Sequence, residues 1–341
     1  MTELRKDIFT GRWVIVDRQA AIQPSDFDFG PFTSKPGPCD FCEGHESATP
    51  PELYAARPRE TSANAPGWTV RIVPNVRPRL RVEGSLDRRA EGFHDLMNGI
   101  GAHEIVVETP RHDRSLHQLD PSAIAAVLQA WGTRITDLRR DDRIRHVLIF
   151  KNHGAEAGAR VSSHSISHLM GLPVTPRTVK AKLTVARDYF TEKERCVYCD
   201  VLRQELEDGR RLIAANHLFV ALAPFASRFP FEMMILPKRH AAEFATLEGE
   251  GHDALARLVQ DVLRKLDRAV PGVPYNLALH NSPRRRHKEG YWTTLEDDFH
   301  WHLEILPQLW PIAGFEWASG FFYNPTPPEA AARRLAEAGS P

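Results

Sequence analysis

Two C-x-x-C pairs, each followed by the same succession of strands, helix and histidines, constrain this fold more than any other feature. Cys39-Asp-Phe-Cys42 and Cys196-Val-Tyr-Cys199 contain all four cysteines of the 341-residue chain. After each pair we predict a strand, a Pro-x-(x)-His turn, a helix and two further strands, the last carrying histidines. Two copies of this length indicate one α+β unit built twice rather than a solenoid, which needs at least three short repeats. We therefore predict two units, residues 1–185 and 186–341.

Hydrophobic periodicity gives the expected elements of each unit. Asp120-Pro121 supplies an N-cap and a first-turn proline, and Ile124, Leu128 and Trp131 then lie on one buried stripe. The first unit is expected to have a strand at 13–16, strands at 68–74, 103–108 and 147–150, and a helix from 121 to about 138. The second is expected to have strands at 217–222, 231–236, 276–280 and 299–306, a helix at 251–270 and a short helix near 328–338.

The repeat also predicts two metal sites. Each half offers two thiolates, a histidine after a strand and a histidine on a later strand: Cys39, Cys42, His112 and His164, then Cys196, Cys199, His240 and His300. A closed Cys2His2 set is typical of structural zinc, so we expect two structural Zn²⁺ ions. His280 is a further candidate in the second half. The alternatives are reduced, partly buried thiols or a thioredoxin-type redox pair, which we disfavour because neither C-x-x-C opens a convincing helix after a core strand.

Charge and hydropathy exclude several classes of partner. Lys plus Arg and Asp plus Glu number 44 each, so no overall basic field favours nucleic acid or an anionic membrane. No stretch approaches the roughly 20 apolar residues of a membrane span, and the first residues lack the apolar core of a signal peptide. We therefore expect a soluble cytoplasmic protein that binds neither nucleic acid nor membrane.

A glycine-rich loop between two strands predicts an anion site. The segment 150–173, FKNHGAEAGARVSSHSISHLMGLP, leaves a strand, crosses Gly154 and Gly158, and enters a strand with His164 and His168. Backbone N–H groups of such loops can approach phosphate oxygens. Alternation along the strand places His164, Ile166 and His168 on one face and Ser165 and Ser167 on the other.

At these residues the sequence resembles the galactose-1-phosphate uridylyltransferase family of the histidine-triad superfamily, including its ADP-glucose phosphorylase-like branch. The matching segments run nearly from end to end: LRKDIFTGRWVIV, CDFC, RIVPN, MNGIGAHEIVVETPRH, FKNHGAEAGA, HSISHLMGLPVTP, FHWHLEILP and GFEWASGFFYNPTPPE. The resemblance implies an α+β fold of tandem histidine-triad units, each with a mostly antiparallel sheet flanked by helices. It also implies a homodimer and zinc on Cys39, Cys42, His112 and His164.

The resemblance further implies a ligand and a reaction. Asn75, Asn152 and the loop Gly154–Gly158 match positions that hold the nucleotide and its phosphates, so the expected partner is a nucleotide or nucleotide sugar. The family transfers a nucleotidyl group through a covalent adduct on the second histidine of H-x-H-x-Q, which splits one displacement into two. Arg160, Ser163, Ser165 and Ser167 are further candidates for contacting phosphate. The C-terminal segment lacks the residues expected for galactose specificity.

The motif differs from the family pattern where the adduct forms. Here it reads His164-Ser165-Ile166-Ser167-His168, which places isoleucine at the nucleophile and histidine at the glutamine. We weigh three interpretations: a nucleotidyltransferase-like enzyme in which His168 takes over, a scaffold recruited to another reaction through His168, His302 or a metal site, and a nucleotide-binding protein without catalysis. The first requires the phosphate to shift, since residue i+2 lies about 7 Å along a strand.

Overall fold

The computed structural model describes residues 2–19, 26–27, 29–30, 38–159, 164–285 and 292–339. Within these ranges one antiparallel sheet has the order β10-β11-β12-β14-β13-β8-β9-β7-β4-β3. Its first-half strands are β3 (Tyr54–Ala56), β4 (Val70–Pro74), β7 (Ala102–Val107), β8 (His146–His153) and β9 (Ile166–Leu172). Its second-half strands are β10 (Leu212–Ala215), β11 (Phe219–Leu222), β12 (Met233–Pro237), β13 (Tyr275–His280) and β14 (His302–Pro307).

The sheet confirms the predicted duplication. From the centre outward the first half reads β8-β9-β7-β4-β3, and the second repeats this order as β13-β14-β12-β11-β10. The two halves join where β8 pairs with β13, with Asn152 opposite Asn276. The α+β class and the mostly antiparallel arrangement are therefore as expected. Whether the units divide at residue 185 stays a prediction, and helix α2 (Arg177–Lys193) spans that position.

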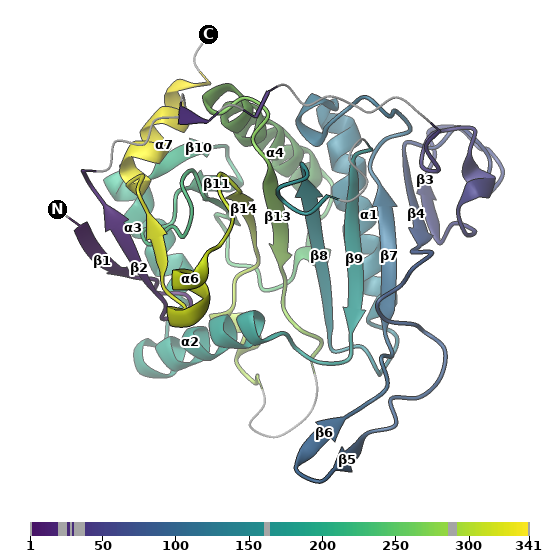
Figure 1. Ribbon diagram of the computed structural model, residues 1–341, viewed down its shortest axis with the longest axis horizontal. Coiled ribbons are helices and arrows are strands. Elements are labelled where there is room, and N and C mark those ends of the chain that lie inside the picture. The colour runs from purple at the N-terminus through teal and green to yellow at the C-terminus, as the bar shows by residue number, and fades with distance from the viewer. Residues whose placement is uncertain are drawn as a thin grey trace.

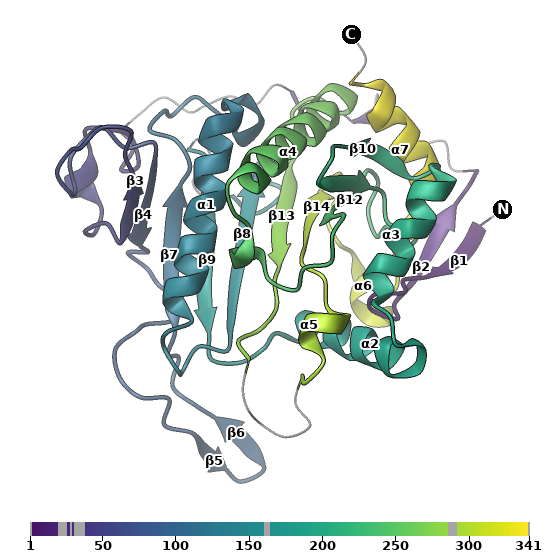
Figure 2. The same ribbon diagram turned by 180° about the vertical axis from the view of Figure 1, so that it is seen from behind.

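Two long helices cover one face of the sheet (Figure 2). They are α1 (Pro121–Leu138) and α4 (Glu250–Ala269), which also pack against each other. The predicted stripe of α1 is buried, with Ile124 and Ile135 at 0% exposure. Burial of apolar side chains against the sheet is the main favourable contribution to folding here, and the same apolar core extends across both halves.

The opposite face is covered unevenly (Figure 1). Helix α2, a small sheet and α6 lie over the second half, whereas β7, β8 and β9 of the first half remain uncovered by helices in that view. The small sheet consists of β1 (Thr2–Lys6), β2 (Trp13–Asp17) and β15 (Phe322–Asn324). The remaining elements are a β5 (Arg89–Glu91)–β6 (His94–Leu96) hairpin, α3 (Val197–Asp208), α5 (Leu295–Asp298), α6 (Gly314–Ser319), α7 (Pro328–Glu337) and short 3-10 helices at Glu46–Ala48, Leu116–Gln118 and Phe244–Thr246.

The elements that the sequence analysis did not predict include β1, α2 and α3, together with the short strands β3, β5, β6, β10 and β15 and the short helices α5 and α6. Cys196 is the N-cap of α3, but α3 follows helix α2 directly, so the second C-x-x-C does not open a helix after a core strand, as expected. Helix α2 is mostly polar and buries only Val179, Leu183, Ala186 and Lys182, so its apolar stripe is too sparse to stand out. None of the helices in the described ranges combines the length and apolar character needed to cross a bilayer.

Candidate active site and metal sites

The first predicted metal set comes together. The ligand atoms of Cys39, Cys42, His112 and His164 all lie within 4.8 Å of one another. Nδ1 of His164 is 3.5 Å from Sγ of Cys39, and Nδ1 of His112 is 3.5 Å from Sγ of Cys42. Nε2 of His164 lies 2.7 Å from the Thr109 carbonyl, so its N–H donates there and the Nδ1 lone pair faces the thiols. Metal-bound histidines are typically oriented in this way.

The second set has the same geometry. The ligand atoms of Cys196, Cys199, His240 and His300 also lie within 4.8 Å of one another. Nε2 of His240 donates to the Glu296 carbonyl at 2.6 Å, and Nε2 of His300 to the Pro237 carbonyl at 3.0 Å. A hydrogen bond from Cys196 lowers the pKa of Cys199, which favours the thiolate that binds metals. Both sets can therefore hold a metal ion, with four protein ligands and no position left for a substrate.

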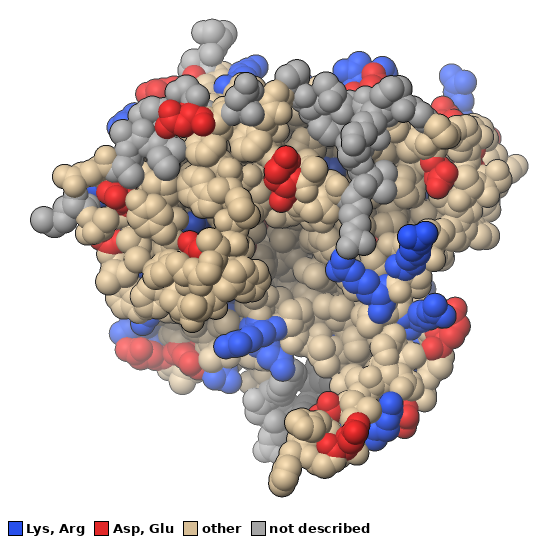
Figure 3. Space-filling view, viewed as in Figure 1, with Lys and Arg blue, Asp and Glu red and all other residues tan. Residues whose placement is uncertain are grey.

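A cavity of about 350 Å³ lies beside β9, on the face away from α1. Ile166 and His168 line it from β9, Phe150 and Asn152 from β8, and His103 from β7. Asn75, Arg77 and Arg79 line it from the segment after β4, and Phe41 from the first C-x-x-C turn. Seen from this side the molecule is hollowed near its centre, with Lys and Arg side chains along one side of the hollow (Figure 3). The cavity thus combines cationic, amide and aromatic groups.

The structure gathers three of the predicted nucleotide or phosphate residues in this cavity, Asn75, Asn152 and Gly158, together with the catalytic candidate His168. It places Ser165 and Ser167 elsewhere. Ser167 accepts the Trp131 indole N–H at 3.1 Å on the α1 face. Ser165 lies between Lys151 and Glu108, at 2.9 and 2.6 Å. Arg160 and Ser163 lie outside the described residues.

Both glycines of the loop after β8 have a positive φ. Gly154 has φ +83°, and a Cβ there would lie 2.8 Å from Cβ of Pro274, so only glycine fits without rearrangement. Gly158 has φ +87°, and its carbonyl accepts from the Asn152 amide at 3.3 Å. Asn276, across the junction of the two half-sheets, donates to Asn152 at 2.9 Å and to the Ala157 carbonyl at 2.8 Å. The second half therefore supports the loop of the first.

Ile166 is an apolar wall of the cavity. It is 9% exposed and packs in a small cluster with Trp68, Val73, Ile105 and Val107. An aliphatic side chain has no lone pair to attack phosphorus. The next residue on the same face of β9, His168, stacks on Phe150 with ring centroids 5.0 Å apart. Any imidazole chemistry near Ile166 must therefore involve His168 or its neighbour His103.

His103 is the residue that the sequence analysis missed. Its Nε2 lies 3.2 Å from Nδ1 of His168, because β7 pairs with β9. Burial and the charge of Arg79 lower the pKa of His103, and burial together with His103 lowers the pKa of His168 to about 4. Both rings are therefore neutral near pH 7. Strand alternation placed His103 and Ile105 on one face, but only the pairing of distant strands brings His103 to His168.

On the face of β14 that corresponds to the cavity face of β9, His302 and Glu304 lie beside His280 of β13. Lys182 fills the space between these three side chains. Lys182 of α2 lies 2.5 Å from Glu304 and 2.6 Å from Nε2 of His302. Burial alone raises the pKa of Glu304, but Lys182, His280 and Arg228 together hold it well below its usual range. His302 is 0% exposed. The Lys182 ammonium thus lies where three metal-ligating side chains converge.

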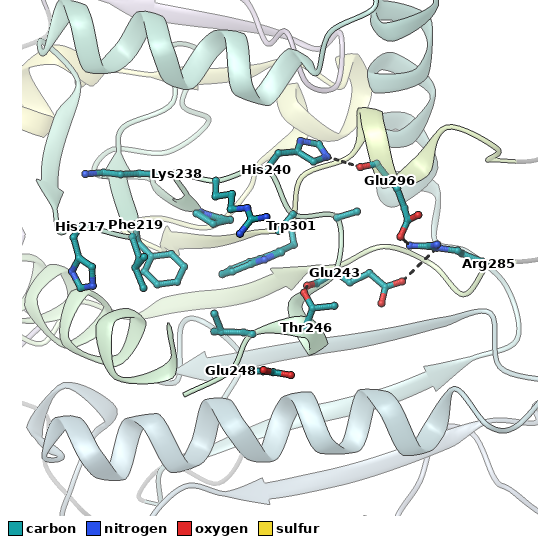
Figure 4. Close-up of a pocket in the computed structure, with 16 residues that line it drawn as sticks. His217, Phe219, Lys238, His240, Glu243, Thr246, Glu248, Arg285, Glu296 and Trp301 are labelled. Atoms are coloured by element: carbon teal, nitrogen blue, oxygen red, sulfur yellow. Dashed lines mark hydrogen bonds and ion pairs between the residues drawn. The ribbon is translucent and has the colours of Figure 1, made fainter. Parts of the chain in front are cut away.

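A larger cavity of about 620 Å³ lies on the helix side of the second half (Figure 4). Trp301 and Phe219 line its interior, and Arg285 at its edge pairs with Glu243 and Glu296. His240 also lines it, with Nε2 bonded to the Glu296 carbonyl. None of the predicted nucleotide residues lines this cavity. The smaller cavity beside β9 is therefore the stronger candidate.

Comparison with known proteins agrees with this geometry. Residues 89–169 match the family "Galactose-1-phosphate uridyl transferase, N-terminal domain" and residues 182–309 match its C-terminal domain. The chain is 36% identical over 340 residues to an ADP-glucose phosphorylase of Arabidopsis thaliana, covering 98% of this chain and 92% of that protein. It is 28% identical over 348 residues to a galactose-1-phosphate uridylyltransferase of Thermotoga maritima, covering 99% and 98%.

A solved structure extends the comparison to three dimensions. An ADP-glucose phosphorylase from Arabidopsis thaliana with bound ADP-glucose superimposes with a TM-score of 0.82 at 33% identity. The match covers 99% of this chain and 98% of that one.

Proposed function

Because the chain belongs to the galactose-1-phosphate uridylyltransferase family, we propose that it acts on the phosphoryl group of a nucleotide-linked small molecule bound beside β9. The observation that carries this proposal is the meeting of Asn75, Asn152, Gly158 and His168 around one cavity. Asn75, Asn152 and Gly158 were nucleotide or phosphate candidates, and His168 was the candidate catalytic residue.

The lining fits a nucleoside diphosphate sugar. Arg77 and Arg79 provide positive charge for phosphates, which arginine can bind through several N–H groups. Phe41 and Phe150 offer aromatic surface, and the amides of Asn75 and Asn152 offer hydrogen bonds. The bound ADP-glucose of the Arabidopsis relative supports the same class of ligand, and ADP-glucose is the first compound to test.

Zinc is the metal that both Cys2His2 sets fit best, since tetrahedral sulfur and nitrogen ligation is its usual structural site. Zn²⁺ would supply rigidity here and no chemistry. In the first half it would connect the Cys39–Cys42 turn, which carries Phe41 of the cavity, to the segment before β9. The homodimer and the cytoplasmic location stay predictions.

Binding and turnover test the proposal together. We expect calorimetric titration with ADP-glucose, UDP-glucose and UDP-galactose to find at least one ligand. Asn152→Ala should weaken that ligand about tenfold, because one hydrogen-bonding amide is lost. Lys238→Gln, in the separate cavity of the second half (Figure 4), is the matched control and should bind normally. Failure of every nucleotide sugar and free nucleotide to bind would refute the proposal.

A second candidate, nucleotide binding without catalysis, is favoured by Ile166 alone. The two candidates differ in one measurement. Incubation of the bound nucleotide sugar with inorganic phosphate, or with a sugar phosphate, should exchange the nucleotidyl group if the protein is an enzyme. Tight binding without exchange for any acceptor would favour the binding protein.

A further inference from the structure

We propose that His103 is a positioning residue that fixes the tautomer of His168, so that His168 presents an N–H donor to the ligand instead of a nucleophilic lone pair. This inference rests on the proposed function for the identity of the ligand. Its structural part concerns the protein alone and is testable without a ligand.

The argument begins at a backbone amide. The Arg79 N–H lies 3.2 Å from Nδ1 of His103. A backbone N–H can only donate, so Nδ1 of His103 is the acceptor and the proton of the neutral ring is on Nε2. That Nε2 is 3.2 Å from Nδ1 of His168. The His103 N–H therefore donates to Nδ1 of His168, and the single proton of neutral His168 is left on Nε2.

The side chain of Asn75 does not change the assignment of the His103 proton to Nε2. Its Oδ1 accepts the Arg77 backbone N–H at 2.9 Å, which assigns the other amide atom as the nitrogen. That nitrogen lies 3.5 and 3.2 Å from the two ring nitrogens of His103. It is nearer to Nε2, but an atom this close to both ring nitrogens lies along the lone-pair direction of neither, because those directions diverge. The Arg79 N–H, which contacts Nδ1, therefore selects the tautomer of His103.

The protonated Nε2 of His168 is available to a ligand. Among the described residues no side chain or backbone group hydrogen-bonds to it, and His168 lines the cavity beside β9. Stacking on Phe150 holds the ring in place. An N–H there suits a phosphoryl oxygen, whereas attack on phosphorus needs an unprotonated nitrogen. The lowered pKa values of His103 and His168 agree with two neutral rings.

Two variants separate positioning from simple packing. His103→Phe keeps a ring but removes the donor, whereas His103→Gln retains an amide N–H at a similar reach. In ¹⁵N-labelled wild type, we expect nitrogen–proton correlation spectra to show a protonated Nε2 on His168, identified by the signal lost in His168→Gln. His103→Phe should shift His168 toward the other tautomer and weaken ADP-glucose binding roughly tenfold. His103→Gln should keep the wild-type tautomer of His168 and bind ADP-glucose within about threefold of wild type.

Three results would overturn the inference: a proton on Nδ1 of wild-type His168, an unchanged tautomer in both His103 variants, or a nucleotidyl adduct on His168 in intact-mass spectra. The spectra of the ligand-free protein judge the tautomer even if no nucleotide binds. A failure of the proposed function is therefore distinguishable from a failure of this inference.

Discussion

In the first half of the sheet, the face of β9 opposite α1 opens into a cavity of about 350 Å³, whereas only about 20 Å³ remains beside Glu304 of β14 in the second half. The strands occupy equivalent places in the sheet order. Each follows a metal-ligand histidine with two alternating positions, Ile166 and His168 in one half and His302 and Glu304 in the other.

The difference arises from what covers each strand. Helix α2 delivers Lys182 to Glu304, and Arg228 pairs with both Glu304 and Glu232. Two cations and two carboxylates thus fill the second face with a buried ion network. Among the described residues, no helix covers the face of β9 opposite α1 (Figure 1), and His168 of that face lines the cavity. The comparison teaches that a duplicated scaffold keeps a Cys2His2 set in each half while a few covering residues decide which half has an open cavity.

The largest effect is expected at the metal sites, where the two halves are alike. Cys42→Ser and Cys199→Ser should each lose one of two bound zinc ions. Each should lower the unfolding free energy by roughly 4 kcal/mol or more and the melting temperature by about 10 °C, because metal binding contributes directly to folding. Metal analysis and thermal melting measure both, with chelator-treated wild type as the control. Zinc bound in only one half would show that the two Cys2His2 sets are not equivalent.

The next largest effect on stability is expected at the face of β14 that Lys182 fills. Lys182→Met leaves the two buried carboxylates with Arg228 and His280, and we expect a loss of about 3–5 kcal/mol in denaturant unfolding. The double variant Lys182→Met/Glu304→Gln removes both charges and should recover most of that loss. If the single variant were as stable as wild type, the ion network would not be the reason that this face is closed.

Nucleotide binding should depend on the open face only. His168→Leu removes the N–H donor and should weaken ADP-glucose binding roughly tenfold, while His168→Gln keeps a donor and should lose less. The charge-neutral Lys182→Met/Glu304→Gln variant should bind like wild type. Calorimetry on wild type and these three variants measures the binding. Weaker binding only in the Lys182→Met/Glu304→Gln variant would place the nucleotide site in the second half instead.

The smallest effect is a pH dependence of stability from His168. Its pKa is lowered to about 4 in the folded protein, against about 6.5 in the unfolded chain. Between these values the unfolded state binds the extra proton, so stability falls as pH decreases from 6.5 to 4. Wild type should lose on the order of 1–2 kcal/mol relative to His168→Gln over that range, allowing for the partial exposure of the ring. Parallel pH profiles would contradict the buried neutral state.

Much of the candidate site was predictable because its signals are local. The C-x-x-C spacing and the repeat named all eight metal-set residues, and loop composition together with strand alternation pointed to Gly158 and His168. His103 was not found, because its role depends on the register of β7 against β9, which puts Ile105 opposite His168. The roles expected of Ser165 and Ser167 depended on neighbours that the sequence does not specify, namely Lys151, Glu108 and Trp131.

The sequence by itself determined the duplicated α+β unit, the two Cys2His2 sets and the isoleucine at position 166. These follow from composition, spacing and periodicity over a few tens of residues. Only the tertiary structure decided that the two half-sheets join through β8 and β13, that Lys182 fills one face, and that His103 orients His168. Those contacts join residues 65 to 130 positions apart, and pairings of that range depend on packing of the whole chain rather than on any local pattern.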